Sequence, residues 1–171
     1  MKTTVLNIIA TALTLTCLTS TSAFALDAPT GDVILTIKGP RLAHPNAGDT
    51  AEFDLAMLEK LVGRSGTMET PWTKGKIEFS GPLLKSILEA AGAEGSTLKV
   101  KALNDYAADV PIEDATKIDT MLATRMNGET MSIRDKGPLF LIYPFDIDSS
   151  LYNEKYFSRS VWQIKEIEVT K

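Results

Sequence analysis

The sequence KIEFSGPLLKSILEAAG, residues 76–92, carries the clearest structural signal in this chain. Residues 76–79 predict a short strand. Pro82 suits the first position of a helix, where its missing N–H costs nothing, so we expect a helix from Pro82 to Ala91. The leucines and other apolar residues of this segment recur at helical spacing on one side. Gly92 then predicts the C-terminal cap.

The residues before this stretch predict two further elements. DVILTIK, residues 32–38, is β-branched and apolar, which is typical of a strand. Asp54 is a good N-cap for a short helix over residues 55–62. Residues 64–70 fit a loop or a strand equally well, and we leave both readings open.

After residue 92 the apolar residues alternate with polar ones, which is typical of half-exposed strands. We expect strands at residues 97–103, 106–112, 121–126, 129–132, 139–144 and 161–169. Asn127-Gly128 separates the third from the fourth and is a strong hairpin signal. A polar turn is expected at residues 113–115, and residues 146–158 show no clear period. Two short helices among these strands predict an α+β domain, mostly β, with a mixed sheet or barrel.

The N-terminal segment is typical of a cleaved export signal. Residues 5–18 form an apolar run that is too short and too polar to span a bilayer stably. Ala23-Phe24-Ala25 then matches a signal peptidase site, so we expect residues 1–25 to be removed before Leu26. An uncleaved membrane anchor is the alternative. The prediction is a periplasmic protein with one domain over residues 26–171 and no direct membrane insertion.

The composition argues against several classes of function. The chain has 18 Lys+Arg against 22 Asp+Glu, a net charge of −4, and gives no reason to expect nucleic acid as a partner. It has one histidine, and its one cysteine, Cys17, lies in the segment expected to be removed. The remaining chain therefore offers no Cys–His pair and no thiolate metal site. Gly-x-Ser-x-Gly and nucleotide-binding glycine motifs are also missing from the sequence.

Five segments together resemble the molybdopterin-binding domain of the sulfite oxidase family. They are KIEFSGPLLKSILEAAG (76–92), VKALNDYAADVPIEDA (100–115), LATRMNGE (122–129), GPLFLIYP (137–144) and RSVWQIKEIEV (159–169). They follow one another in the order of that family. The resemblance implies a mostly β, mixed α+β domain that binds the pterin end of the molybdenum cofactor.

The chain departs from the family pattern in two places. The resemblance implies a metal-ligating cysteine in the region of residues 64–75, which here reads RSGTMETPWTKG and supplies no thiolate, the soft ligand that such a metal prefers. Near the end, Trp162 follows Val161 directly where the family tends to have a lysine before the tryptophan. Residues 1–25 also lack the arginine pair that marks export of cofactor-loaded proteins. These departures predict a protein without molybdenum cofactor.

A flat pterin ring needs aromatic faces and a few fixed polar groups. The segments that resemble the family's pocket supply such residues, namely Trp72, Tyr106, Asp109, Arg125, Tyr143, Phe145 and Trp162. Asp109, and after it Asp146, is the candidate carboxylate for the N–H edge of a pterin. Arg125 could donate to the ring or stack on it. Three of these residues also have an ordinary structural interpretation. Trp162 could fill the core, Asp109 could be a turn residue, and Arg125 could pair with Glu129.

The resemblance implies a periplasmic, non-catalytic protein that binds a tetrahydropterin-type molecule. It further implies that the protein reports ligand occupancy to a membrane-bound signalling partner of the diguanylate cyclase or phosphodiesterase type. Two alternatives stay open. One is a molybdopterin-dependent oxidoreductase whose metal is held by the cofactor's own sulfurs, and the other is an adaptor domain without a ligand.

Overall fold

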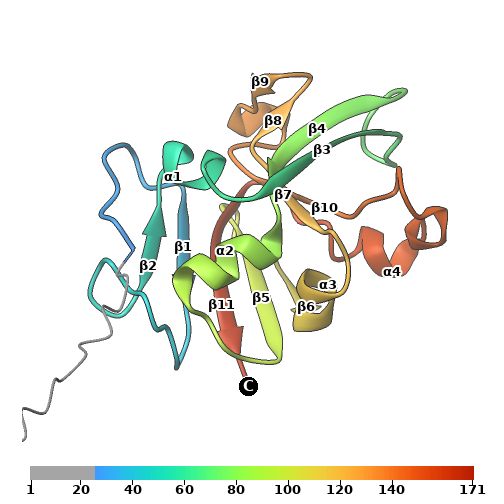
Figure 1. Ribbon diagram of the computed structural model, residues 1–171. Helices are drawn as coiled ribbons and strands as arrows, with labels where there is room; N and C mark the ends of the chain where they lie inside the picture. Colours follow the sequence, from blue (N-terminus) through green and yellow to red (C-terminus); the bar gives the residue numbers. More distant parts are fainter. Residues whose placement is uncertain (1–25) are drawn as a thin grey trace, which may run out of the picture.

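A five-stranded mixed sheet is the largest element of the computed structural model, which describes residues 26–171 (Figure 1). Its strands lie in the order β2 (Ala51–Phe53), β1 (Leu35–Lys38), β11 (Ile164–Thr170), β5 (Thr97–Ala102) and β6 (Ala107–Pro111). The β1–β11 pair is parallel and the other pairs are antiparallel. The expected α+β fold with a mixed sheet is confirmed. The expected signal peptide lies outside the described residues.

The helix α2 (Leu84–Ala91) covers the inner face of this sheet, as Figure 1 shows. Gly92 caps it in the left-handed conformation, as expected, with φ 60°. The expected start at Pro82 is wrong. Pro82 is the last residue of β4 (Ile77–Pro82) and lies opposite Gly63 of the neighbouring strand. The ladder therefore continues through the proline, and the helix begins after Leu83.

The remaining strands form two smaller sheets. The four-stranded sheet contains β3 (Gly63–Met68), β4, β8 (Arg125–Met126) and β9 (Glu129–Thr130), and the two-stranded sheet pairs β7 (Met121–Ala123) with β10 (Phe140–Ile142). Of residues 64–70, which fitted a loop or a strand, residues 64–68 lie in β3 and the last two follow it. The expected hairpin joins β8 to β9, with positive φ angles at Asn127 (52°) and Gly128 (82°). A two-residue type I′ turn requires both.

Several one-turn helices are too short for a helical period to be recognised. The first, α1 (Leu55–Glu59), ends before the expected residue 62, while α3 (Ile112–Thr116) replaces the expected polar turn. The segment without a period contains α4 (Glu154–Phe157), capped by the Asn153 side chain. Over residues 26–171, none of the helices combines the length and the apolar composition that crossing a bilayer requires.

The buried side chains form two clusters. The aliphatic core lies between the five-stranded sheet and α2 and contains residues such as Leu35, Ile87 and Ile167. The aromatic core lies under the two smaller sheets and contains Phe79, Phe140, Tyr143 and Phe145, with Trp72 and Phe157 packed against it. The candidate site lies where the two clusters meet.

Candidate functional site

A cavity of about 340 Å³ opens at the junction of the two cores. It takes Ala102 and Val161 from the aliphatic core and aromatic side chains from the other side. The complete lining is Trp72, Ala102, Asn104, Tyr106, Phe157, Ser158, Ser160, Val161 and Trp162. We call it the aromatic cavity. The lining contains no ionisable acid or base except the phenol of Tyr106.

Trp72 lies in the loop between β3 and β4 and is held in place by a compact turn. The buried Thr70 hydroxyl accepts from the Trp72 backbone N–H (3.3 Å) and hydrogen-bonds the Thr73 hydroxyl (2.8 Å). The indole meets the rings of Phe140 and Phe157 edge-on, with centroids 5.6 and 5.7 Å away. Edge-to-face pairs of this kind fix the orientation of an aromatic wall.

Trp162 forms the next part of the wall and is 37% exposed. Its ring centroid lies 5.8 Å from that of Trp72 and 6.0 Å from that of Phe140. The ammonium group of Lys136 lies over the Trp162 ring, 5.1 Å from its centroid, which is a cation–π contact. The cavity therefore has two indole rings in contact, one of them with a cation over its face.

Tyr106 closes the opposite side from the turn between β5 and β6. Its hydroxyl donates to the Ser158 carbonyl oxygen (3.3 Å), and its backbone N–H donates to Asn104 Oδ1 (3.2 Å). The second contact orients the Asn104 amide, because the oxygen must face the N–H. Asn104 Nδ2 is left as the donor of this side chain.

Unusual backbone conformations border the cavity. Asp105 (φ 65°), Lys136 (φ 73°) and Gln163 (φ 56°) are three of the four non-glycine residues with positive φ in residues 26–171. The segments are tied together, since Gln163 donates from its backbone to the Lys136 carbonyl and accepts from Leu103 N–H. Such conformations are uncommon and tend to gather at functional sites.

A partly buried ion pair anchors the wall segment 157–162. Arg159 Nη1 donates to Asp114 Oδ2 (2.8 Å), and the Tyr143 hydroxyl donates to the same oxygen (2.7 Å). Asp114 is 6% exposed and Tyr143 is fully buried. Burial, and then the hydrogen bond to Asp114, hold the pKa of Tyr143 far above its ordinary value. Tyr143 thus belongs to the anchor of the wall and does not line the cavity.

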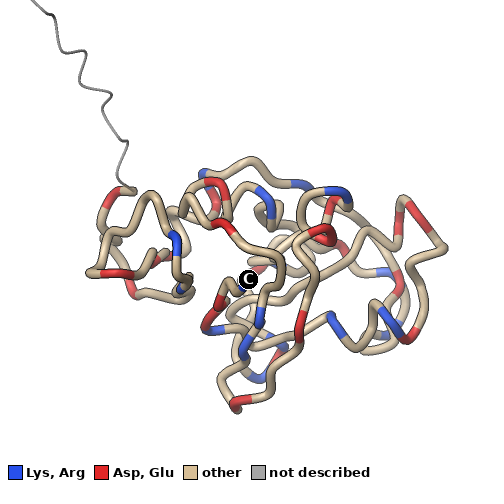
Figure 2. Tube along the Cα trace, turned by 90° about the horizontal axis from the view of Figure 1, so that it is seen from below, with Lys and Arg blue, Asp and Glu red and all other residues tan. Residues whose placement is uncertain are grey.

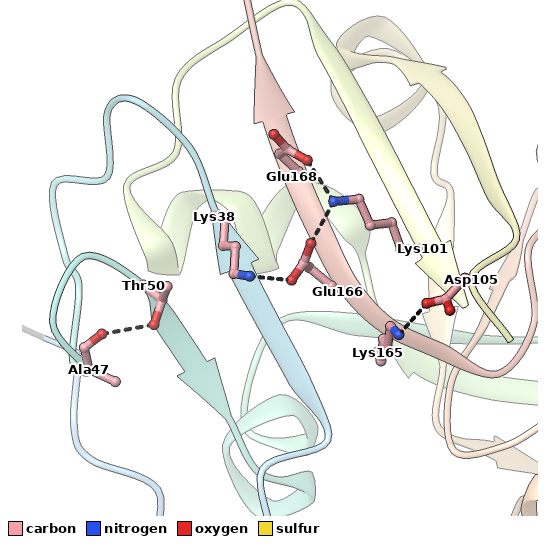
Figure 3. Close-up of polar contacts among 8 residues, drawn as sticks. All are labelled: Lys38, Ala47, Thr50, Lys101, Asp105, Lys165, Glu166 and Glu168. Carbon is pink, nitrogen blue, oxygen red and sulfur yellow. Dashed lines mark hydrogen bonds and ion pairs between the residues drawn. The ribbon is translucent and has the colours of Figure 1, made fainter. Parts of the chain in front are cut away.

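Acidic and basic positions are interspersed along the described chain, as Figure 2 shows. On the outer face of the five-stranded sheet, Glu166 accepts from Lys38 (2.6 Å) and Lys101 (2.8 Å), and Lys101 also reaches Glu168 (Figure 3). Burial would raise the pKa of Glu166, but the two lysines lower it overall. These charges neutralise one another on the sheet.

The same figure shows an ion pair at the turn that carries Asn104 and Tyr106. Lys165 donates to Asp105 (2.7 Å) beside Asn104 and Tyr106 (Figure 3). The hydrogen bond from Lys165 lowers the pKa of Asp105. The pair supports the turn whose backbone holds Asp105 at positive φ.

Three of the seven residues expected at the site come together in the aromatic cavity: Trp72, Tyr106 and Trp162. Asp109 lies elsewhere, exposed on β6 and opposite Lys99 on the outer face of the sheet. Phe145 lines a separate, more open hollow together with Asp146. The Asp146 carboxylate is occupied by an ion pair with Arg64.

Arg125 also lies away from the aromatic cavity. Its Nε and Nη2 donate to the two carboxylate oxygens of Glu59 (2.7 and 3.1 Å), where the sequence had suggested Glu129 as a partner. The hydrogen bond from Arg125 lowers the pKa of Glu59. Because its fork is already occupied by a carboxylate, Arg125 supports the junction of α1 and β8.

Six lining residues were not predicted from the sequence: Ala102, Asn104, Phe157, Ser158, Ser160 and Val161. Phe157 and Ser158 come from the segment without a period, and Ser160 lies just after it. Asn104 directly precedes Asp105 and Tyr106, so the turn was visible but the role of its amide was not. The Asp114–Arg159 anchor joins residues 45 positions apart and left no signal in the sequence.

The sequence matches the family model of the oxidoreductase molybdopterin binding domain over residues 56–171. No curated protein matches the chain. Among solved structures, the chain is similar to the crystal structure of the sulfane dehydrogenase SoxCD from Paracoccus pantotrophus, with a TM-score of 0.56 and 18% sequence identity. The match covers 80% of this chain and 37% of that one. At this identity the likeness concerns the fold alone.

Proposed function

This chain belongs to the family of oxidoreductase molybdopterin-binding domains, and from that premise we propose that it binds a reduced pterin, without molybdenum, in its aromatic cavity. The observation that carries the proposal is the wall itself. Trp72, Tyr106 and Trp162 supply aromatic surface, and the remaining lining is small or neutral. A cavity of about 340 Å³ is at the small end of the range for ligand sites, which suits a bicyclic ring.

The residues of the cavity do not fit the molybdenum end of the family's cofactor. The one cysteine of the chain, Cys17, is not among residues 26–171, and these residues contain no group of three or more His, Cys, Asp or Glu placed to hold a metal ion. Hydroxyls of Ser158 and Ser160 are hard donors, and a molybdenum centre of this kind prefers thiolate. The proposal therefore contains no redox step.

The residues of the chain would bind and orient the ring. Trp72 and Trp162 exclude water from its faces, Asn104 donates to its edge, and Tyr106 covers it from the opposite side. The Asp114–Arg159 pair keeps the wall segment in position before the ligand arrives. A prepared site of this kind loses little conformational entropy on binding.

We further propose that binding occurs in the periplasm and is reported to a membrane-bound signalling protein of the diguanylate cyclase or phosphodiesterase type. The signal-like residues 1–25 support the location, and the resemblance alone supports the partner. A ligand can shift such a partner only if it favours one state of the complex. Tyr106 and Trp162 are the exposed aromatic residues of the cavity, so a bound ring would alter the surface that a partner meets.

Calorimetry of the purified protein with a tetrahydropterin tests the proposal. Both tryptophans of the chain line the cavity, so quenching of their fluorescence provides a second measurement. Trp72→Ala and Trp162→Ala are each expected to weaken binding at least about tenfold, because the lost stacking surface is large. Asp109→Ala, on the outer face of the sheet, is the matched control and should bind like the unaltered protein. Absence of binding with ligand in the high micromolar range would end the proposal.

Family membership favours one competing function, a molybdopterin-dependent oxidoreductase. It requires that the cofactor's own sulfurs hold the metal without help from the protein. Metal analysis of the protein purified from its native source distinguishes the two. Stoichiometric molybdenum would replace the pterin-binding proposal by this one.

A further inference from the structure

The polar groups of the aromatic cavity can be assigned individually as donors or acceptors. Ser158 Oγ donates to the Lys155 carbonyl (3.0 Å) and Ser160 Oγ donates to the Tyr156 carbonyl (2.9 Å). With their protons committed, both hydroxyls can only accept from a ligand. The Ser158 carbonyl already accepts from Tyr106 and has a second lone pair.

Asn104 is the exception in this set. Its Oδ1 faces the Tyr106 backbone N–H, so its Nδ2 is directed elsewhere and is free to donate. The cavity therefore presents one amide donor among several oxygen lone pairs. Such a set matches a ring edge that has several N–H groups and one carbonyl oxygen.

The cations of the neighbouring segments are already engaged. Arg159 is paired with Asp114, Lys165 with Asp105, and Lys136 lies over the face of Trp162. None of the three is part of the cavity lining. A phosphate group entering the cavity would meet several oxygen lone pairs and one neutral amide donor but no cation, and placing a charge there without a counter-charge is costly.

From this arrangement we infer that the aromatic cavity selects uncharged, N–H-rich planar heterocycles, rejects their phosphate monoesters, and reads the ring carbonyl through Asn104. This inference rests on the proposed function and narrows it.

The test compares two ligands that differ only by one terminal phosphate group. One is a tetrahydropterin with a trihydroxypropyl side chain, and the other is its terminal phosphate monoester. Calorimetry is expected to give a dissociation constant at least about tenfold larger for the ester. Equal or tighter binding of the ester would overturn the inference and leave the proposed function standing. If neither compound binds, both are overturned.

Two variants test the assigned groups. Asn104→Asp keeps the oxygen that accepts from Tyr106 and removes the Nδ2 donor, so affinity for the uncharged pterin should fall about tenfold. Unchanged affinity would show that Asn104 does not donate a hydrogen bond to the ring carbonyl. Ser158→Lys adds a cation at the exposed rim and should narrow or reverse the preference against the ester. A ratio that stays as in the unaltered protein would show that charge is not what excludes phosphate.

Asp109→Asn is the matched control for Asn104→Asp, because it makes the opposite change in the same strand-turn region outside the cavity. It should leave the ratio of the two dissociation constants unaltered. Circular dichroism and thermal unfolding of every variant distinguish a lost contact from a lost fold.

Discussion

The aliphatic core and the aromatic core are built by different means. Around the aliphatic core, regular strands and α2 bury alternating side chains, and hydrogen bonds run along ladders. Around the aromatic core, short strands are joined by loops, and edge-on rings and a partly buried ion pair hold the parts together. The cavity takes its tryptophans and Phe157 from the aromatic side, and Ala102, Asn104 and Tyr106 from β5 and the turn that follows it. The difference indicates that the regular sheet supplies stability, while the site is formed where its β5–β6 turn meets the aromatic side.

The largest effect on stability should come from the centre of the sheet. Ile167 lies in the middle of β11 and is fully buried. Ile167→Ala should lower the free energy of unfolding by about 3 kcal/mol through lost burial and a residual cavity. Val33→Ala, at a 44% exposed position, is the control and should cost less than about 0.5 kcal/mol. Urea unfolding measures both, and equal costs would show that burial at the centre of the sheet is not what stabilises the fold.

The ion pair behind the wall should give a smaller effect on stability but a larger one on the site. Asp114→Asn leaves Arg159 without its counter-charge and should cost about 2 kcal/mol. It should also loosen the segment that contains Trp162, seen as lower anisotropy of tryptophan fluorescence. Ile167→Ala should not change that anisotropy while the protein stays folded. If both variants lower the anisotropy equally, the wall segment 157–162 is not held in place independently of the sheet.

Asp54 links stability to acid pH on the aliphatic side. Its carboxylate accepts from the backbone N–H groups of Met57, Gly31 and Thr30 (2.8 Å each), which lowers its pKa from 3.8 to about 2. Because the pKa is lower in the folded protein than in the unfolded chain, the ionised carboxylate stabilises the fold at pH values above the unfolded-state pKa. This stabilisation is lost as the pH falls toward 2. Asp54→Ala should therefore melt several degrees below the unaltered protein at neutral pH. Thermal scans should show the gap closing between pH 4 and 2; a constant gap would contradict the assignment.

The smallest effect should come from the charges on the outer face of the sheet. Lys101 bridges Glu166 and Glu168, and these hydrogen bonds raise its pKa. Exposed ion pairs contribute little, so Lys101→Met should lower the melting temperature by no more than about 3 °C at low salt. The difference should shrink further in about 0.5 M salt, where charges are screened. A larger, salt-independent loss would show that Lys101 acts through packing.

The two regions also differ in how far the sequence predicted them. Period-two alternation predicted β5 and β11, and helical spacing with Gly92 predicted the body of α2, because each element has one buried face. The expected helix start at Pro82 failed because tertiary pairing with Gly63 extends the strand through the proline. One-turn helices such as α3 and α4 were missed because four or five residues contain no usable period.

For the site, the sequence predicted three of the aromatic residues that line the cavity, but it did not predict where the charged candidates lie. Trp72, Tyr106 and Trp162 were expected in one pocket and do line one cavity, whereas Asp109 and Arg125 lie on other surfaces. Successive residues of a strand lie on opposite faces of the sheet. The face on which Asp109 lies therefore depends on the strand register, which only the β5–β6 pairing reveals. Asn104 acquires its donor role from a hydrogen bond to Tyr106 within a turn, which composition does not disclose.

The position of β11 has a consequence for how the molecule is made. This strand, residues 164–170, lies between β1 and β5, so it joins segments more than sixty residues upstream to each other. Until this strand has been synthesised, β1 and β5 have no common neighbour in the sheet. The central part of the sheet can therefore form only after residues 164–170 have been made, and a chaperone that binds incompletely folded chains would bind this intermediate.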